Sequence, residues 1–351
     1  MHNFKKALST TTALILAFLI TFAAIIAPCF DADSQCSDAK LRRDLSGKID
    51  YIFSGASHTF QAVDPSVIDQ ELGVCSYNMS SPSASMDGRY TLLEKEVYRN
   101  NLDTVVIDIS FDGLTRSAAS ENAVGEPMIA CRLDSLSESI GYLADHTSFF
   151  NNDVENVISI FMRYGLKAWK DKLTGQTGVL QRNKGFWPIP AIDVRLKTEE
   201  IVETYNTEQG HIVFSEENIE QLEKMIRLCH ENNIRVMVVV IPLSDAFLWQ
   251  HSNMDGFLAE LKLLCEKNNC PVYDFNLLRN RYEIFSDQDA FCNLTHMSES
   301  GAASFSKAFC DLVKELDVNA NVDNLFYGSY DELKQSSPYM YIYKEYHHIA
   351  F

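Results

Sequence analysis

Three side chains of this protein have the chemistry needed for acyl transfer. Ser57 follows a Gly-Ala turn, and His296 comes three residues after Asn293. A serine hydroxyl is a weak nucleophile until a base takes its proton, and an imidazole oriented by a third polar group is a common base. With Ser57 as nucleophile, His296 as base and Asn293 orienting the ring, the three would form a catalytic triad if the fold brought them together.

The elements that must position them alternate along the chain. Short β-branched and aromatic runs are separated by amphipathic helical patterns. The predicted strands are 49–54, 74–79, 103–110, 235–242 and 271–275. The fourth is almost continuously apolar, as expected of a central parallel strand that is buried on both faces. The sequence therefore predicts an α/β fold, a three-layer α/β/α sandwich with right-handed crossovers.

The candidate residues follow predicted strands. The first strand leads to Ser57 and His58, the second to Asn78 and Ser80, and the loop after the fifth leads to His296. In open parallel sheets, ligands bind beyond the carboxyl ends of the strands. We expect these polar groups to converge at that edge, where His58 is either a substrate contact or a structural hydrogen-bonding residue.

These segments resemble the spaced blocks of the SGNH (GDSL-type) hydrolase superfamily. The matching blocks are Gly55-Ala56-Ser57-His58, Asn78-Met79-Ser80 and the stretch from Asn293 to Ala302, and the resemblance covers roughly residues 48–112 and 215–316. It is closest to a cell-envelope branch that includes relatives of teichoic-acid D-alanyl-transfer and polysaccharide O-acetylation proteins. The resemblance implies a flavodoxin-like sheet of strand order 2-1-3-4-5, with a Ser57 nucleophile and a His296 base. It also implies reaction with ester-linked acyl groups without a cofactor.

The last block departs from that superfamily, which has Asp-x-x-His where this chain has Asn293. An amide can still hold an imidazole by a hydrogen bond, but it stabilises the imidazolium less than a carboxylate does. Asp287 and Asp289 are alternative carboxylate partners. The structural alternatives are that Ser57 only tightens a turn and that His296 is a surface or capping residue.

The oxyanion-binding blocks depart as well. Ser80 replaces the glycine of the second block, although its backbone N–H can still serve an oxyanion. The third block, Gly-x-Asn-Asp in the superfamily, is Ile109-Ser110-Phe111-Asp112 here. Asn78 is then the remaining candidate for a side-chain donor. Loss of one such donor typically costs about 10²–10³ in rate.

The N-terminal segment, residues 1–36, predicts where the protein works. Two lysines within the first six residues precede the uncharged run Ala7–Phe30, and acidic residues come after it. A run of this length can cross a bilayer core of roughly 30 Å, and its flanking charges predict export of the chain after the run. We expect an anchor in the cytoplasmic membrane and an extracytoplasmic domain, 37–351. The alternatives are a cleaved signal, which would make the protein secreted, and a buried helix of the body.

Two further segments interrupt or extend the α/β pattern. Residues from about 113 to 210 are predicted to be a helical insertion between the third and fourth strands, forming a cap over one end of the sheet. The Tyr-rich tail, residues 326–351, has no predicted place.

Cysteine spacing argues against a metal site. Nine cysteines are present, of which Cys29 lies in the apolar run. The other eight are an even number, which would permit disulfides in an oxidising compartment. No Cys-x-x-Cys and no His pair at ligand spacing occurs, so we expect no bound metal.

Charge excludes one class of partner and leaves two functions. The chain carries 30 Lys and Arg against 48 Asp and Glu, a net charge of −18, and no basic cluster that would bind nucleic acid. No Gly-rich phosphate loop follows the first strand, which argues against a flavodoxin-like binder of nucleotides or flavin. We expect a membrane-anchored serine esterase or acyltransferase acting on an acylated envelope glycan or glycopolymer. The alternative is a catalytically impaired binding or assembly component that works with envelope-modifying partner proteins.

Overall fold

The computed structural model describes residues 12, 16–17, 20–21, 23–30, 37–111, 113–115, 125–146, 148–176, 178–204 and 212–347. Asp112 and Cys36 lie outside the described residues, as do parts of the N-terminal segment, the insertion and the tail. The chain divides into two compact units. Unit 1 comprises Met1–Asp44 and Asn122–Arg182, and unit 2 comprises Leu45–Glu121 and Asn183–Phe351.

Unit 2 is built on a five-stranded parallel sheet of order β2-β1-β3-β4-β5. Its strands are β1 (Tyr51–Ser54), β2 (Ser76–Asn78), β3 (Thr104–Asp108), β4 (Arg235–Val240) and β5 (Val272–Asp274). Every residue of β1, β2 and β3 is buried, and so are the last five residues of β4. The predicted α/β class and strand order are confirmed, and each strand is shorter than its apolar run because the run continues into the adjoining loop.

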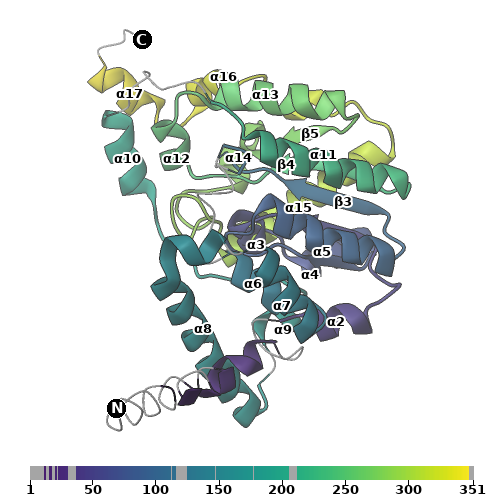
Figure 1. The fold of residues 1–351 in the computed structure, drawn as a ribbon. Helices are drawn as coiled ribbons and strands as arrows, with labels where there is room; N and C mark the ends of the chain where they lie inside the picture. Colours follow the sequence, from purple (N-terminus) through teal and green to yellow (C-terminus); the bar gives the residue numbers. More distant parts are fainter. Residues whose placement is uncertain are drawn as a thin grey trace. The chain divides into compact units, whose positions relative to one another are not determined.

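Helices cover both faces of this sheet (Figure 1). On one face α5 (Met86–Arg99) packs against α11 (Glu216–Glu231), and on the other α15 (Glu299–Asp317) packs against α3 (Ser57–Ala62) and α4 (Pro65–Leu72). In β1, the side chains of successive residues point to opposite faces. Phe53 meets Phe309 of α15 edge to face, with ring centroids 5.1 Å apart. This arrangement is the predicted three-layer sandwich.

Local sequence signals fix several helix ends. The Asp64 carboxylate accepts a hydrogen bond from the Ser66 backbone N–H at 2.9 Å, Pro65 opens α4, and Gly73 ends it with a left-handed φ of 69°. These are the N-cap, first-turn proline and C-terminal glycine that helices favour. Ser215 stands at the N-cap of α11 as predicted, but its side chain makes no capping hydrogen bond.

The Tyr-rich tail, which has no assignment from sequence, packs on unit 2. Helix α16 (Tyr330–Ser336) contacts α13 (Met254–Lys267), and α17 (Met340–Tyr346) contacts α10 (Arg195–Glu203). The hydroxyl of Tyr330, whose ring is buried, donates to the Asp274 carboxylate at the end of β5. The remaining helical segments of unit 2 are α12 (Asp245–Gln250), η3 (Phe275–Leu277), α14 (Arg281–Ile284) and η4 (Asp323–Leu325).

Unit 1 is helical in its described residues and joins two distant parts of the chain. Its elements are η1 (Ala27–Phe30), α2 (Ala39–Asp44), α6 (Gly125–Cys131), α7 (Leu136–Asp145), α8 (Ser148–Thr174) and α9 (Val179–Arg182). Within it, fully buried Asp38 forms ion pairs with Arg42 of α2 and with Arg132, which follows α6. A buried carboxylate held by two guanidinium groups is strongly destabilised when one partner is removed. This ion network therefore ties the residues after the N-terminal apolar run to the start of the insertion.

The predicted insertion, about 113–210, is distributed over both units. Residues 122–182 belong to unit 1, whereas those from Asn183 onward belong to unit 2. Among the described residues, no helix is both long enough and apolar enough to cross a membrane. The eight cysteines that the structure describes are all free thiols.

Candidate active site

Ser57 lies at the carboxyl end of β1, as the first residue of α3. The turn between them depends on Gly55, since a Cβ built there would lie 1.9 Å from Thr59 Oγ1 and 3.1 Å from Asp108 Cβ. No other residue fits that space without moving α3 or β3. Gly55 therefore lets the chain turn sharply and leaves Ser57 half-buried at the sheet edge.

His296 lies on a loop that is held at both ends. Phe291 and Met297, both fully buried, form an antiparallel bridge, and the Cys292 backbone N–H donates to the His296 carbonyl at 2.9 Å. Immediately afterwards Ser298 caps α15 by accepting from the Gly301 N–H at 3.1 Å. The loop is thus anchored in the core while its tip, residues 293–296, stays at the surface.

The structure brings Ser57, His296 and Asn293 into one hydrogen-bonded chain. His296 Nε2 lies 2.7 Å from Ser57 Oγ, and His296 Nδ1 lies 3.1 Å from Asn293 Oδ1. Ser57 and His296 are half-buried and Asn293 is exposed. These distances are within hydrogen-bonding range, and their order matches that of a nucleophile, a base and an orienting group.

The order of these three side chains determines which nitrogen of His296 carries the proton. An amide oxygen only accepts hydrogen bonds, so Asn293 Oδ1 favours the tautomer with the proton on His296 Nδ1. The lone pair on Nε2 is then free to accept the Ser57 hydroxyl proton. The arrangement can therefore raise the nucleophilicity of Ser57 without any further group.

Thr295 is a member of this chain that the sequence reasoning missed. Its hydroxyl lies 2.9 Å from His296 Nδ1 and 3.2 Å from Asn293 Oδ1. Asn293 Oδ1 also accepts from the backbone N–H groups of residues 295 and 296, each at 2.9 Å. One amide oxygen with two lone pairs is thus shared among several donors, which weakens its hold on the imidazole. The Asn-x-Thr-His spacing is the signal that could have identified Thr295.

His58 stacks on the base. Its ring centroid lies 4.7 Å from that of His296, with only 17° between the two ring planes. Like Ser57, it is half-buried and belongs to the first turn of α3. The stack fixes the plane of the His296 ring from one side, which is a positioning effect and leaves the substrate-contact interpretation a prediction.

Asn78 and Ser80 are placed near the same edge but are engaged within the fold. The fully buried Asn78 amide donates to the Thr59 and Val63 carbonyls, at 2.8 and 3.0 Å, and its oxygen accepts from the Ser80 backbone N–H at 3.1 Å. Both amide hydrogens of Asn78 are therefore committed to holding the α3 segment on β2, and the Ser80 N–H closes the turn after β2 on Asn78. The oxyanion role of Asn78 and Ser80 stays a prediction, and in this conformation the Asn78 amide acts as a structural clamp.

The alternative carboxylates do not pair with His296 in this structure. Asp287, which is buried, accepts from Thr198 Oγ1 at 2.7 Å and from the Asp245 backbone N–H at 3.3 Å. The Asp289 backbone carbonyl accepts from Ser298 and Ser300, and no contact joins its side chain to the imidazole. In the part of the chain that the structure describes, Asn293, which stands where a Ser-His-Asp triad has its carboxylate, is the one of these three candidates that contacts His296.

Asp287 belongs instead to a buried ion network. Arg281, wholly buried, lies 3.1 Å from the Asp245 carboxylate and donates to the Leu243 and Asn276 carbonyls. Burial raises the pKa of Asp245 to about 6, and the Arg281 charge only partly opposes this. The network fixes the chain ahead of the His296 loop, because Arg281 begins α14 and Asp287 lies four residues before Phe291.

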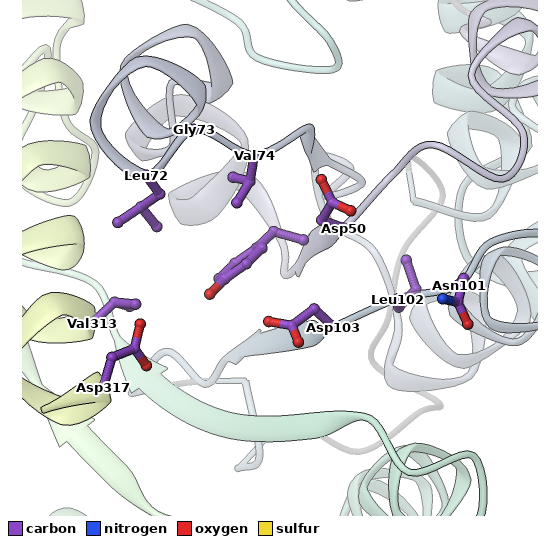
Figure 2. Close-up of a pocket in the computed structure, with 10 residues that line it drawn as sticks. Asp50, Leu72, Gly73, Val74, Asn101, Leu102, Asp103, Val313 and Asp317 are labelled. Atoms are coloured by element: carbon purple, nitrogen blue, oxygen red, sulfur yellow. The ribbon is translucent and has the colours of Figure 1, made fainter. Parts of the chain in front are cut away.

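A cavity of about 600 Å³ lies at the opposite ends of the strands (Figure 2). Its lining includes Asp50, Asp103 and Asp317, and Figure 2 shows these carboxylates around a space between the starts of β1 and β3 and helix α15. Each has a partner in the fold: Asp50 accepts from the Cys75 N–H, Asp103 from Thr104, and Asp317 from Arg235. The cavity is thus separate from the Ser57 edge. Among the described residues, no group of three His, Cys, Asp or Glu side chains is arranged to hold a metal ion.

Comparison with known proteins adds no relative. No protein-family model matches this sequence, and no curated protein matches it.

Proposed function

We propose that this protein is an SGNH-like serine esterase or O-acyltransferase that acts on acyl esters of a cell-envelope glycan through an acyl-Ser57 intermediate. The observation that carries the proposal is the 2.7 Å contact between Ser57 Oγ and His296 Nε2, with Asn293 on the far nitrogen. Residues widely separated in sequence meet in the order that activates a serine.

The reaction follows from that order. As Ser57 Oγ attacks the ester carbonyl, His296 Nε2 takes the hydroxyl proton, and the C–O bond to the alcohol then breaks as the imidazolium returns the proton to the leaving oxygen. Water or an acceptor hydroxyl next attacks acyl-Ser57 and loses its proton to His296. The bond between the acyl carbon and Ser57 Oγ then breaks as the imidazolium returns the proton to Oγ, which releases the acyl group as an acid or a new ester and restores Ser57. Hydrolysis and transfer thus share every residue and differ only in the second nucleophile.

An aromatic pair on α3, the helix that begins with Ser57, supports a sugar-bearing substrate. Trp187 stacks on Phe60 of α3 with centroids 5.9 Å apart, and its backbone N–H donates to the Phe60 carbonyl at 3.1 Å. Trp187 is half-buried, whereas Phe60 is buried. A large rigid ring with one apolar face is suited to packing against a pyranose.

The N-terminal apolar run supports a location outside the cytoplasmic membrane. Under this proposal Ala7–Phe30 is the anchor, and unit 2 faces the envelope where acylated glycans and glycopolymers occur. A cleaved signal would give the same compartment with a secreted protein.

Two features of the site favour a second function: the residue that orients the imidazole is uncharged, and the expected oxyanion donors already bond within the fold. Asn293 supplies no charge to an imidazolium, and the Asn78 amide and Ser80 N–H are used within the fold. These features suit a binding or assembly component of an envelope-modifying complex, in which the same edge holds an acylated glycan without turning it over.

Ester hydrolysis by purified protein separates the two. We expect wild type to hydrolyse p-nitrophenyl acetate and to release acetate from an O-acetylated glycan, whereas Ser57→Ala loses both activities and keeps its circular dichroism spectrum. Ser66→Ala, which removes an exposed serine hydroxyl from the adjoining helix α4, is the matched control and retains activity. Equal hydrolysis by Ser57→Ala and wild type would refute the acyl-Ser57 intermediate.

A further inference from the structure

The second half of α8 carries two adjacent stripes of different character. The apolar side chains Met162, Leu166, Trp169 and Leu173 follow one another at intervals of four, three and four residues. At 3.6 residues per turn this spacing keeps them on one face. Leu166, Trp169 and Leu173 are 57%, 41% and 80% exposed, which is unusual for three large apolar side chains on one face.

A row of basic residues runs beside the apolar stripe. Arg163, Lys167 and Lys170 each follow an apolar member by one position and repeat its spacing, and all three are exposed. The only acidic residue from 162 to 174 is Asp171, which is half-buried. In a chain of net charge −18 this is a local concentration of positive charge.

The same part of α8 packs against the N-terminal apolar run within unit 1. A Cβ built on Gly165 would lie 2.3 Å from the Ile25 carbonyl oxygen, so the two backbones are in close contact. The Trp169 indole N–H donates to the Ala24 carbonyl at 3.0 Å. The described residues Leu16 and Ile20 of that run are also exposed, at 57% and 61%. Unit 1 therefore carries exposed apolar side chains both on α8 and on the run that packs against it.

We propose that this face of α8 is a membrane-contact surface that lies on a bilayer bearing anionic headgroups. Leu166, Trp169 and Leu173 would enter the boundary between headgroups and acyl chains, while Arg163, Lys167 and Lys170 would meet the lipid phosphates. An apolar stripe with tryptophan beside a row of basic residues is the pattern of helices that lie in the membrane interface. A second copy of the chain would satisfy the apolar stripe but would bring two basic rows close together, which disfavours it.

The inference rests on the proposed anchoring of residues 7–30 and adds a second contact that orients the protein. A single spanning segment leaves the attached domain free to tilt. A helix packed on that segment and lying in the interface would hold unit 1 at the bilayer.

Quenching by brominated lipids tests the inference with the intact chain reconstituted into vesicles. Vesicles of phosphatidylcholine alone and of phosphatidylcholine with 30% phosphatidylglycerol would carry bromine near the top of the acyl chains. We expect Trp emission to be quenched at least twofold more with phosphatidylglycerol present, and Trp169→Phe to lose this component, because Trp169 is the tryptophan of the exposed stripe.

Charge and apolar variants sharpen the test. Replacing Arg163, Lys167 and Lys170 by Gln should remove the dependence on phosphatidylglycerol, and Leu173→Glu, at an 80% exposed position, should reduce quenching without affecting folding. A triple Gln variant of Lys224, Lys267 and Lys307, exposed or half-exposed lysines of unit 2, is the charge-matched control and should behave as wild type.

The possible outcomes separate failure of the α8 contact surface from failure of the anchor on which it rests. Protein that does not float with the vesicles would refute the anchor. Protein that floats but shows no Trp169 quenching, or equal quenching in the Arg163/Lys167/Lys170 variant, would refute the contact surface. A blue-shifted Trp169 emission that depends on protein concentration in detergent, without lipid, would assign the face to a second copy and would also overturn the proposal.

Discussion

Unit 2 contains two hydrogen-bonded groups of side chains that differ in charge and in burial. The chain from Ser57 through His296 to Asn293 is partly exposed and has no charged member when the imidazole is neutral. The network of Asp245, Arg281 and Asp287 is almost wholly buried: the Arg281 guanidinium pairs with the Asp245 carboxylate, and Asp287 accepts from the Asp245 backbone N–H. Ser57 follows β1 and Asp245 follows β4, whereas the other members of both groups lie on the segment after β5.

This difference in charge and burial gives the two groups different roles: the neutral group suits chemistry, and the buried ionic group suits structural support. A proton can move along a neutral, accessible chain, and a substrate can reach it. A buried ion network holds its members in place, because breaking one pair leaves an uncompensated charge in the interior. The ionic network thus fixes the start of the segment that ends at His296, and the neutral chain is left to do chemistry.

Removing the central charge of the buried network should have the largest effect on stability. Arg281→Met leaves the Asp245 and Asp287 carboxylates without their cation, so we expect a loss of about 3–5 kcal/mol in the free energy of unfolding. Urea denaturation followed by circular dichroism measures it. Arg279→Met is the matched control, because the exposed Arg279–Glu332 pair is worth less than about 1 kcal/mol. Equal losses in the two variants would show that burial does not distinguish them.

The network should also make stability depend on pH. The pKa of Asp245 is raised from 3.8 to about 6, mainly by burial. The neutral carboxyl therefore stabilises the fold fully below pH 3.8, and this contribution, about 3 kcal/mol by linkage, is lost as the pH rises through about 6. In Asp245→Asn that loss should be absent when unfolding is measured between pH 4 and pH 7. A wild-type and variant difference that is constant over this range would contradict the assignment.

A charge placed in the neutral chain should increase its reactivity. Asn293→Asp supplies a carboxylate at the position that lies 3.1 Å from His296 Nδ1. Attraction between the carboxylate and the imidazolium at a partly exposed site is worth about 1–4 kcal/mol, so we expect at least about a fivefold faster acylation of Ser57. Stopped-flow acylation with an activated ester measures the rate. Gln288→Glu, which turns an exposed amide ahead of the loop into a carboxylate, is the matched control and should not reproduce the gain; if it does, the effect is not specific to position 293.

The stacked ring should have the smallest effect. His58→Phe keeps an aromatic face against His296 and removes the titratable group. If His58 only positions the base, acylation should change by less than about threefold, because ring pairs are worth about 0.5–1.5 kcal/mol and most of that is retained. A loss of 10² or more would instead give His58 a part in proton transfer, since that is the usual size of a general acid or base contribution.

The sheet could be predicted from the sequence because the signals for its strands and helices are local. The apolar run of β4 and the Asp64-Pro65 start of α4 each report their own element, and both are confirmed. Ser57, His296 and Asn293 could be selected because strand ends of a parallel sheet share one edge. The meeting of the three side chains follows from that rule and not from any local feature.

The features that the sequence did not reveal depend on contacts between distant residues. Nothing near Asn78 indicates that its amide would clamp two carbonyls of the α3 segment, and nothing near Arg281 distinguishes a buried guanidinium from the exposed one two residues earlier. The ion pair of Asp38 with Arg132 links residues on either side of the first three strands, and its sequence separation hides it. Burial of charge is decided by tertiary packing, which a charge pattern alone does not encode.

Labelling of the full chain with a fluorophosphonate, read by intact mass, tests most directly whether Ser57 is an activated nucleophile. The account predicts one adduct on wild type at neutral pH, none on Ser57→Ala, and slow labelling of His296→Gln, all with native circular dichroism spectra. A folded wild type that takes up no probe, or an adduct that persists in Ser57→Ala, would contradict it.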